Sequence, residues 1–161
     1  MKQLCLIRHA RANLQKANES DLDRNLSTEG EKDALWLGSV LKDKGIYPDQ
    51  IVSSSAKRAM RTAEIISEAI NYPIESIYPA QEVYDSEVEN LMGVIHGFND
   101  EHQLVFLVGH NPSISMIVTY LTKHSLGNMA AAGLFSCKFH IDSWQAVSKD
   151  SGIFDFILEP D

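Results

Sequence analysis

The stretch Leu104-Val105-Phe106-Leu107-Val108-Gly109-His110-Asn111-Pro112 decides the fold of this chain. Its first five residues form the longest uninterrupted apolar run in the sequence. Such a run is typical of a strand buried on both faces of a parallel sheet. Pro112 suits the first turn of a helix, and apolar residues follow at helical spacing (Ile114, Ile117, Val118 and Leu121). The stretch therefore predicts a buried strand that leads straight into a helix.

Strand-like and helix-like segments also alternate on both sides of this stretch. We expect further strands over residues 3–7, 50–52, 74–78, 134–139, 144–147 and 154–158. A capping box of Thr28 and Glu31 predicts the start of a helix that ends near Gly45. The serines at 53–55 predict the cap of a second helix, whose buried stripe is Ala59, Ala63, Ile66 and Ile70 and which Pro73 ends. Ser86 is the expected cap of a third helix.

Strands that alternate with helices predict βαβ units and a three-layer α/β fold. The sheet should be mostly parallel with helices on both faces, and the C-terminal strands should be antiparallel at an edge. Residues 1–161 contain no repeat, linker or low-complexity tract, so we expect a single domain. Hydrophobic residues make up 44% of the chain and charged residues 22%, which excludes disordered and fibrous classes.

The apolar runs are also too short for a membrane. A spanning helix needs about 20 apolar residues, and the N-terminal run is cut short by Arg8 and His9, which excludes a signal-peptide core. We therefore expect a cytoplasmic protein. Cys5 and Cys137 each lie in a strand-like segment, and we expect buried thiols rather than a disulfide.

The net charge of −8 argues against nucleic acid or an anionic membrane as a main partner. All five arginines nevertheless lie in the first 61 residues, which hold 11 Lys and Arg against 8 Asp and Glu. Such a concentration of guanidinium groups fits one local anion site, although ordinary surface placement explains it equally well.

Three predicted strands end in reactive or anion-binding residues. Arg8 and His9 end the first, Arg58 follows the second together with Lys57 and Arg61, and His110 follows the fourth. Ligands of open α/β sheets bind outside the carboxyl ends of the strands. Arginine forks match phosphate oxygens, and histidine can attack phosphorus. These residues predict phosphoryl chemistry through a phosphohistidine, whereas His96, His102, His124 and His140 are expected to be structural.

Four motifs give the chain a resemblance to the histidine phosphatase superfamily, the phosphoglycerate mutase-like branch. Leu6-Ile7-Arg8-His9-Ala10 resembles its Arg-His-Gly signature, and Val52-Ser53-Ser54 with Arg58-Ala59 and Thr62-Ala63 resembles its second motif. Val108-Gly109-His110-Asn111-Pro112 resembles the segment of its second histidine. The block Asp21-Leu22-Asp23-Arg24-Asn25-Leu26-Ser27 with Gly30 is similar to small SixA-type phosphohistidine phosphatases. Ala10, Ser55 and Arg61 depart from the usual glycine, proline and glutamine-like residues.

The resemblance implies a role for each matching residue. His9 would be the nucleophile, Arg8 and Arg58 would hold the phosphoryl oxygens, and His110 would donate a hydrogen bond to the same group. No metal or other cofactor is implied. The general acid stays open between Glu82 and Asp85, and Asp85 could instead cap the following helix.

The expected activity is a metal-independent phosphatase that acts on protein phosphohistidine. A small-molecule phosphomonoesterase on the same scaffold is the alternative. A non-catalytic phosphate-binding module is a third reading, but it would not need both histidines. A metal hydrolase using His9, His110 and Asp21 or Asp23 lacks any tight ligand spacing. We expect a monomer whose partner is a phosphorylated protein of the histidine-phosphotransfer type or a small phosphoester.

Overall fold

The computed structural model describes residues 1–161 and contains one six-stranded mixed sheet and four α-helices. The strand order is β3-β2-β4-β1-β5-β6. The strands are β1 (Lys2–Arg8), β2 (Gln50–Ser54), β3 (Tyr78–Ala80), β4 (Leu104–Gly109), β5 (Leu134–Phe139) and β6 (Ile153–Leu158). The helices are α1 (Thr28–Lys44), α2 (Lys57–Ile70), α3 (Val88–His96) and α4 (Ser113–Thr122).

Strand pairing brings three parallel strand ends together. β4 pairs in parallel with β1 on one side and with β2 on the other, and β2 also pairs in parallel with β3. β5 runs antiparallel to β1, and β6 pairs antiparallel with β5 at the edge. The carboxyl ends of β1, β4 and β2 are therefore neighbours, which is the arrangement that lets the polar residues at these strand ends converge.

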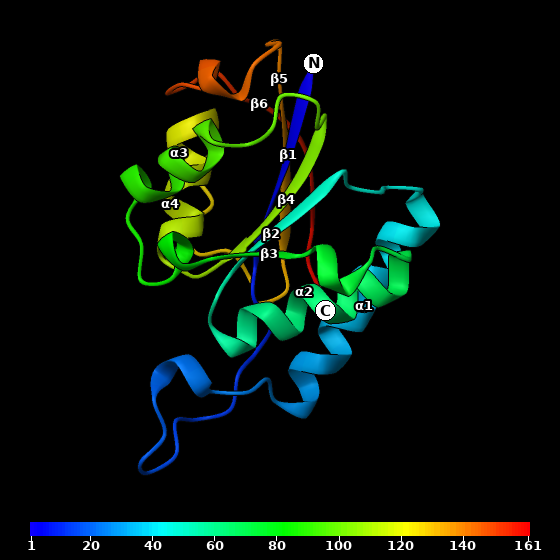
Figure 1. Ribbon diagram of the computed structural model, residues 1–161, viewed down its shortest axis with the longest axis vertical. Coiled ribbons are helices and arrows are strands. Elements are labelled where there is room, and N and C mark those ends of the chain that lie inside the picture. The colour runs from blue at the N-terminus through cyan, green and yellow to red at the C-terminus, as the bar shows by residue number, and fades with distance from the viewer.

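The central strands are buried on both faces, which explains their nearly continuous apolar sequences. Leu4 and Leu6 of β1 belong to the core that α3 and α4 cover, while Cys5 and Ile7 belong to the core under α1 and α2. Figure 1 shows the sheet nearly edge-on, with α3 and α4 on one side and α1 and α2 on the other. This confirms the three-layer arrangement with helices on both faces.

Two segments that were predicted to be strands are different. Residues 74–76 form a short 3-10 helix, and β3 begins only at Tyr78. Residues 144–146 form another 3-10 helix, in which Trp144 is fully buried and its indole Nε1 donates to the His102 carbonyl oxygen. At residues 144–147 the apolar pattern therefore comes from a short turn that buries Trp144, and not from a strand.

None of the three predicted N-terminal helix caps is the residue that precedes the helix in the structure. Ser27, not Thr28, caps α1, because its hydroxyl accepts from the Gly30 backbone N–H. Ser53 and Ser54 belong to β2, and Ala56 precedes α2 without a side-chain cap. Glu87 rather than Ser86 caps α3, in a capping box with Asn90.

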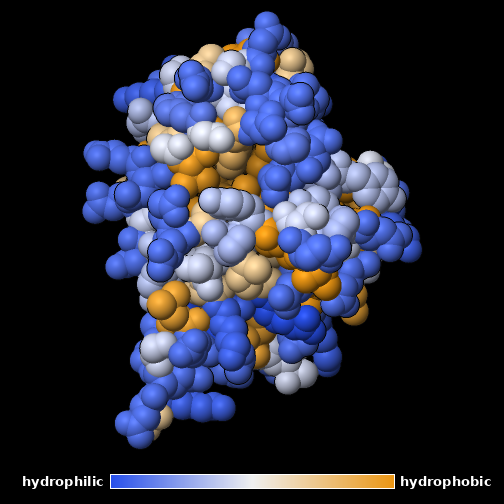
Figure 2. All heavy atoms as spheres, in the orientation of Figure 1, coloured by the Kyte–Doolittle hydropathy of each residue, from blue (hydrophilic) through white to orange (hydrophobic).

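The two cysteines are free and buried, as expected, and burial raises the pKa of Cys5 to about 12. None of the helices combines the length and apolar character needed to cross a bilayer. Most of the face drawn in Figure 2 is hydrophilic. The chain between β1 and α1, residues 9–27, protrudes at the bottom of Figures 1 and 2 and passes close to the carboxyl ends of the strands. We call it the protruding segment.

Candidate active site

The ends of β1, β2 and β4 surround a polar cavity of about 320 Å³. Arg8 is the last residue of β1, His9 follows it, and His110 follows β4. Arg58 stands in the first turn of α2, just beyond β2. All four side chains line the cavity, and the two imidazole ring centroids lie 4.9 Å apart. The predicted convergence of two histidines and two arginines is thus present.

His9 is held in one tautomer by its own backbone neighbourhood. Its Nδ1 lies 2.7 Å from the Ala10 carbonyl oxygen, and a carbonyl can only accept, so Nδ1 carries the proton. The Nε2 atom therefore keeps its lone pair. Burial, followed by the positive charges of Arg58, Arg8 and Arg24, lowers the pKa of His9 to about 4. At neutral pH this side chain is therefore an uncharged imidazole whose free Nε2 can act as a nucleophile.

The backbone beside His9 is fixed by a buried threonine. The Ala10 N–H donates to Thr62 Oγ1, and the Thr62 hydroxyl donates to the carbonyl oxygen of Arg58 one turn earlier on α2. Thr62 and Ala10 are fully buried. The chain after β1 is therefore tied to the helix that carries Arg58.

Arg8 is anchored through one end of its guanidinium group. Its Nη1 donates to the Met129 carbonyl oxygen at 2.7 Å. Its Nε is buried without any hydrogen-bond partner in the protein. A buried, unsatisfied donor is rare in folded proteins, and beside a polar cavity it is expected where a ligand supplies the acceptor.

Arg58 is almost wholly buried and is held by Asp21 from the protruding segment. Its Nη2 lies 2.9 Å from Asp21 Oδ2, and its Nη1 donates to the Asp21 carbonyl oxygen. The same carboxylate accepts from Tyr84 at 2.8 Å and from Arg24 at 3.1 Å. The Tyr84 hydroxyl above all, then Arg24 and Arg58, hold the pKa of Asp21 well below its usual range. Asp21 is therefore a fixed carboxylate that aligns Arg58.

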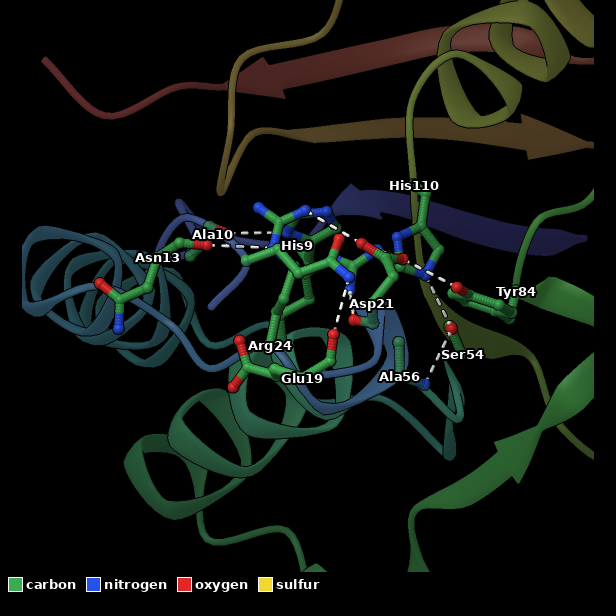
Figure 3. Close-up of polar contacts among 12 residues, drawn as sticks. His9, Ala10, Asn13, Glu19, Asp21, Arg24, Ser54, Ala56, Tyr84 and His110 are labelled. Carbon is green, nitrogen blue, oxygen red and sulfur yellow. Dashed lines mark hydrogen bonds and ion pairs between the residues drawn. The ribbon is translucent and has the colours of Figure 1, made fainter. Parts of the chain in front are cut away.

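Asp21, Arg24 and Tyr84 also line the cavity. The sequence offered Asp21 only as a candidate metal ligand and gave no role to Arg24 or Tyr84. Figure 3 shows Asp21 close to both Tyr84 and the imidazole pair. The sequence block that contains Asp21 and Arg24 resembles small phosphohistidine phosphatases, and this resemblance was the one sequence feature that could have pointed to these two residues. Tyr84 gave no signal, because its contact with Asp21 joins residues 63 positions apart.

His110 is oriented by Ser54 at the end of β2. Its Nε2 lies 2.7 Å from Ser54 Oγ, which in turn accepts from the Ala56 N–H. Because a hydroxyl both accepts and donates, Ser54 Oγ can donate to Nε2, and in that arrangement the proton of the neutral ring lies on Nδ1, the nitrogen on the side of His9 (Figure 3). Burial, then the charges of His9 and Arg58, lowers the pKa of His110 to about 3. A neutral His110 of this tautomer presents a donor to the cavity.

The two general-acid candidates differ in position. Asp85 lines the cavity, whereas Glu82 is exposed on the short helix Gln81–Val83 and does not line it. Asp85 is not the cap of α3, since Glu87 occupies that position. Arg61 also lies outside the cavity, where it pairs with Glu31 and Glu64. No group of three or more His, Cys, Asp and Glu side chains is arranged to hold a metal ion.

Comparison with known proteins agrees with this geometry. The family model of the histidine phosphatase superfamily (branch 1) matches residues 4–91, and the chain belongs to this superfamily. It is a phosphatase of that class, with the phosphoglycerate mutase-like α/β fold.

The proteins similar to this chain include a phosphatase known from its sequence and two solved structures. The chain is 29% identical over 153 residues to the "Uncharacterized phosphatase PhoE" of Bacillus subtilis (strain 168), covering 76% of this chain and 78% of the relative. The crystal structure of "the putative phosphohistidine phosphatase SixA from Agrobacterium tumefaciens" superposes with a TM-score of 0.85 at 25% identity, covering 99% of this chain and 98% of that one. A protein histidine phosphatase SixA complexed with tungstate shares the fold, with a TM-score of 0.82, 21% identity, and coverage of 97% and 96%.

Proposed function

We propose that this protein removes the phosphoryl group from protein phosphohistidine through a covalent phosphohistidine on His9. The observation that carries the proposal is the His9 tautomer. A neutral imidazole with its Nε2 lone pair free stands in a cavity flanked by two guanidinium groups. This is the arrangement needed to attack phosphorus while the charge of the phosphoryl oxygens is neutralised.

The reaction has two displacements. In the first, His9 Nε2 forms a bond to phosphorus while the bond between phosphorus and the substrate imidazole breaks, and that imidazole leaves with a proton from solvent or a nearby acid. Arg8 and Arg58 bind the non-bridging oxygens, and His110 donates to the same group from Nδ1. In the second displacement, water attacks the phosphorylated His9 and releases phosphate, which restores the neutral imidazole. Phosphoryl transfer depends mainly on such positioning and charge neutralisation.

The acid–base groups of the cavity favour a phosphohistidine substrate. Asp21 cannot donate a proton because its carboxylate is locked by Tyr84 and two arginines. Asp85 remains as the candidate proton donor of the cavity, and it is exposed to solvent. An alkoxide leaving group requires a well-placed acid, whereas a departing imidazole, with an unperturbed pKa of about 6.5, leaves with little help.

The alternative, a small-molecule phosphomonoesterase, is supported by the position of Asp85 in the cavity lining. The two functions are separated by Asp85→Asn, with Glu82→Gln as the matched control outside the cavity. We expect Asp85→Asn to lower turnover of a phosphohistidine protein by less than about tenfold, against the roughly 10²–10⁴-fold typical of a lost general acid. Turnover of alkyl phosphates should fall much more, and Glu82→Gln should change neither.

Faster turnover of alkyl phosphates than of phosphohistidine protein by the native enzyme, with a collapse in Asp85→Asn, would establish the small-molecule function instead. The proposal also includes metal independence, because the guanidinium groups of Arg8 and Arg58 supply the positive charge and His110 supplies a hydrogen bond. Activity that is lost with a chelator and restored by Zn²⁺ or Mg²⁺ would contradict this part. A cytoplasmic histidine-phosphotransfer protein is the proposed partner, and the proposed form is a monomer.

A further inference from the structure

A second and larger hollow lies between α3 and α4, outside the cavity that holds the histidines. Its volume is about 1190 Å³. Both helices begin at the catalytic cavity, because Ser86, two residues before α3, and Ser113, the first residue of α4, line that cavity. The two serine hydroxyl oxygens lie 3.4 Å apart. We call the hollow the α3/α4 groove, and it starts at the rim of the catalytic cavity.

The groove follows one face of each helix. Its lining residues on the helices are 88, 89, 92, 93 and 96 of α3 and 115, 116, 119 and 120 of α4, which is the spacing of a single face of each helix. Residues 123, 125, 127, 149 and 150 complete the lining. Met116 is 56% exposed although residues on either side of it are buried. With Met92 and Tyr120 it forms an adaptable apolar surface, and Gly93 leaves room for close approach.

The dimensions of the groove fit a helix. From Ser113 to Lys123 the chain of α4 advances about 15 Å at 1.5 Å per residue, which is roughly three helical turns. A groove between two helices that presents apolar side chains, here Val88, Met92, Met116 and Tyr120, is a recurrent binding site for a third, amphipathic helix. Such a helix would extend directly from the catalytic cavity.

The far end of the groove carries a net positive charge. Lys123 and Lys149 line that end together with Asp150, while Glu89 lies near the catalytic end. Lys123 is 4.0 Å from Asp150, and Lys149 makes no ion pair. In a protein with a net charge of −8, a basic end favours an acidic segment and the C-terminus of a bound helix.

We propose that the α3/α4 groove binds an amphipathic helix of the phosphoprotein substrate. The phosphohistidine enters the catalytic cavity, apolar side chains follow along Met92 and Met116, and acidic side chains about three turns farther on meet Lys123 and Lys149. This inference rests on the proposed function and assigns the surface by which the protein substrate is distinguished from small phosphoesters.

The test compares a protein substrate with a small one. Met116→Glu places a charge in the apolar groove, and Leu35→Glu on α1 is the matched control, since Leu35 is 55% exposed and lies outside the groove. The probes are a histidine-phosphotransfer domain phosphorylated on histidine, and phosphoramidate. We expect Met116→Glu to lower kcat/KM for the domain about tenfold or more, mainly through KM, because a charge at the centre of an interface is costly. Phosphoramidate turnover should stay unchanged, and Leu35→Glu should affect neither substrate.

A second experiment tests the lysine side chains at the far end of the groove. Lys149→Glu should lower kcat/KM for the phosphorylated domain about threefold at low salt, and the loss should fade as salt screens the contact. Equal losses on both probes, or no loss on the domain, would overturn the groove proposal alone. A dimer of this chain that Met116→Glu dissociates would show that a second copy occupies the groove, which also overturns it. Native enzyme that hydrolyses small phosphoesters but never the phosphorylated domain would reject the proposed function itself.

Discussion

His9 and His110 show how a few residues set the chemistry of the cavity. Their rings lie 4.9 Å apart, His110 is buried and His9 is partly buried, so a proton on either one would stand beside two guanidinium groups with little hydration. Burial therefore keeps both imidazoles neutral. The Ala10 carbonyl then determines that His9 carries its proton on Nδ1, and the Ser54 hydroxyl can donate to Nε2 of His110, an arrangement that leaves Nδ1 of that ring protonated.

The first prediction concerns the nucleophile. His9→Ala should abolish turnover and leave the fold intact, because His9 lies after the end of β1 and not within either hydrophobic core. Rapid quenching of the native enzyme at alkaline pH during turnover should trap acid-labile phosphate on His9. Undiminished activity of the variant, with an unchanged urea midpoint, would contradict the assignment.

The second prediction concerns ionisation of the two histidines. Nuclear magnetic resonance titration of ¹⁵N-labelled side chains should show His9 and His110 neutral at pH 6 and protonated only near pH 4 and pH 3. Both pKa values are lower in the folded than in the unfolded state, so the unfolded state binds more protons below about pH 6.5. The stability contributed by these groups is present above that pH and is lost as pH falls through the folded pKa values. Titration of either ring near pH 6.5 would refute the assigned environment.

At the scale of elements, α2 links the sheet to Arg58, the arginine proposed to bind the phosphoryl group. Its stripe of Ala59, Ala63, Ile66 and Ile70 is buried against the sheet. The other side of α2 packs on α1, where Gly38 allows close contact. A Cβ atom at position 38 would lie 2.6 Å from the Cβ of Ala69. The position of Arg58 thus depends on the tight crossing of two helices.

The third prediction follows from this crossing. Gly38→Ala should destabilise the protein by about 1–3 kcal/mol, the usual cost of forcing extra volume into a packed core, despite the better helix propensity of alanine. The free energy of urea unfolding measures the effect. Ser39→Ala at the neighbouring exposed position is the control and should change stability by less than about 0.5 kcal/mol. Equal stability of the two variants would show that the helices separate without cost.

At the scale of the whole molecule, the site exists only when three strand ends and the protruding segment meet. Arg8, Arg58 and Asp21 come from separate parts of the chain, so the unfolded state has no comparable anion site. An anion that binds the cavity must therefore stabilise the folded state by mass action.

The fourth prediction uses this linkage. Phosphate, sulfate or vanadate should inhibit competitively, and a concentration 100 times Kd should stabilise the protein by about 2.7 kcal/mol, seen as a higher Tm. Arg58→Ala should lose most of this response. Arg11→Ala should keep it, because Arg11 is an exposed arginine that pairs with Asp33 outside the cavity. An equal response in both variants would mean that the anion binds elsewhere.

The sequence by itself determined the layers and the central chemistry of this protein. Both follow from local patterns, since a strand buried on two faces must be apolar throughout and the residues that follow parallel strands share one edge of the sheet. Arg8, His9 and His110 could therefore be assigned to one edge of the sheet, and the strand order showed that β1 and β4 are neighbours there. The segments at 74–78 and 144–147 were misassigned because a short apolar run does not distinguish a strand from an anchored turn.

Only the tertiary structure decided which polar side chains complete the cavity. Asp21 meets Arg58 across 37 positions and Tyr84 across 63, and no local pattern encodes such a meeting. Likewise, Asp85 faces the cavity and Glu82 faces solvent, although both belong to one short segment. The physical reason is the same in each case: the contacts arise from how the protruding segment and the chain after β3 fold back over the sheet edge, and that is fixed by the packing of the whole molecule.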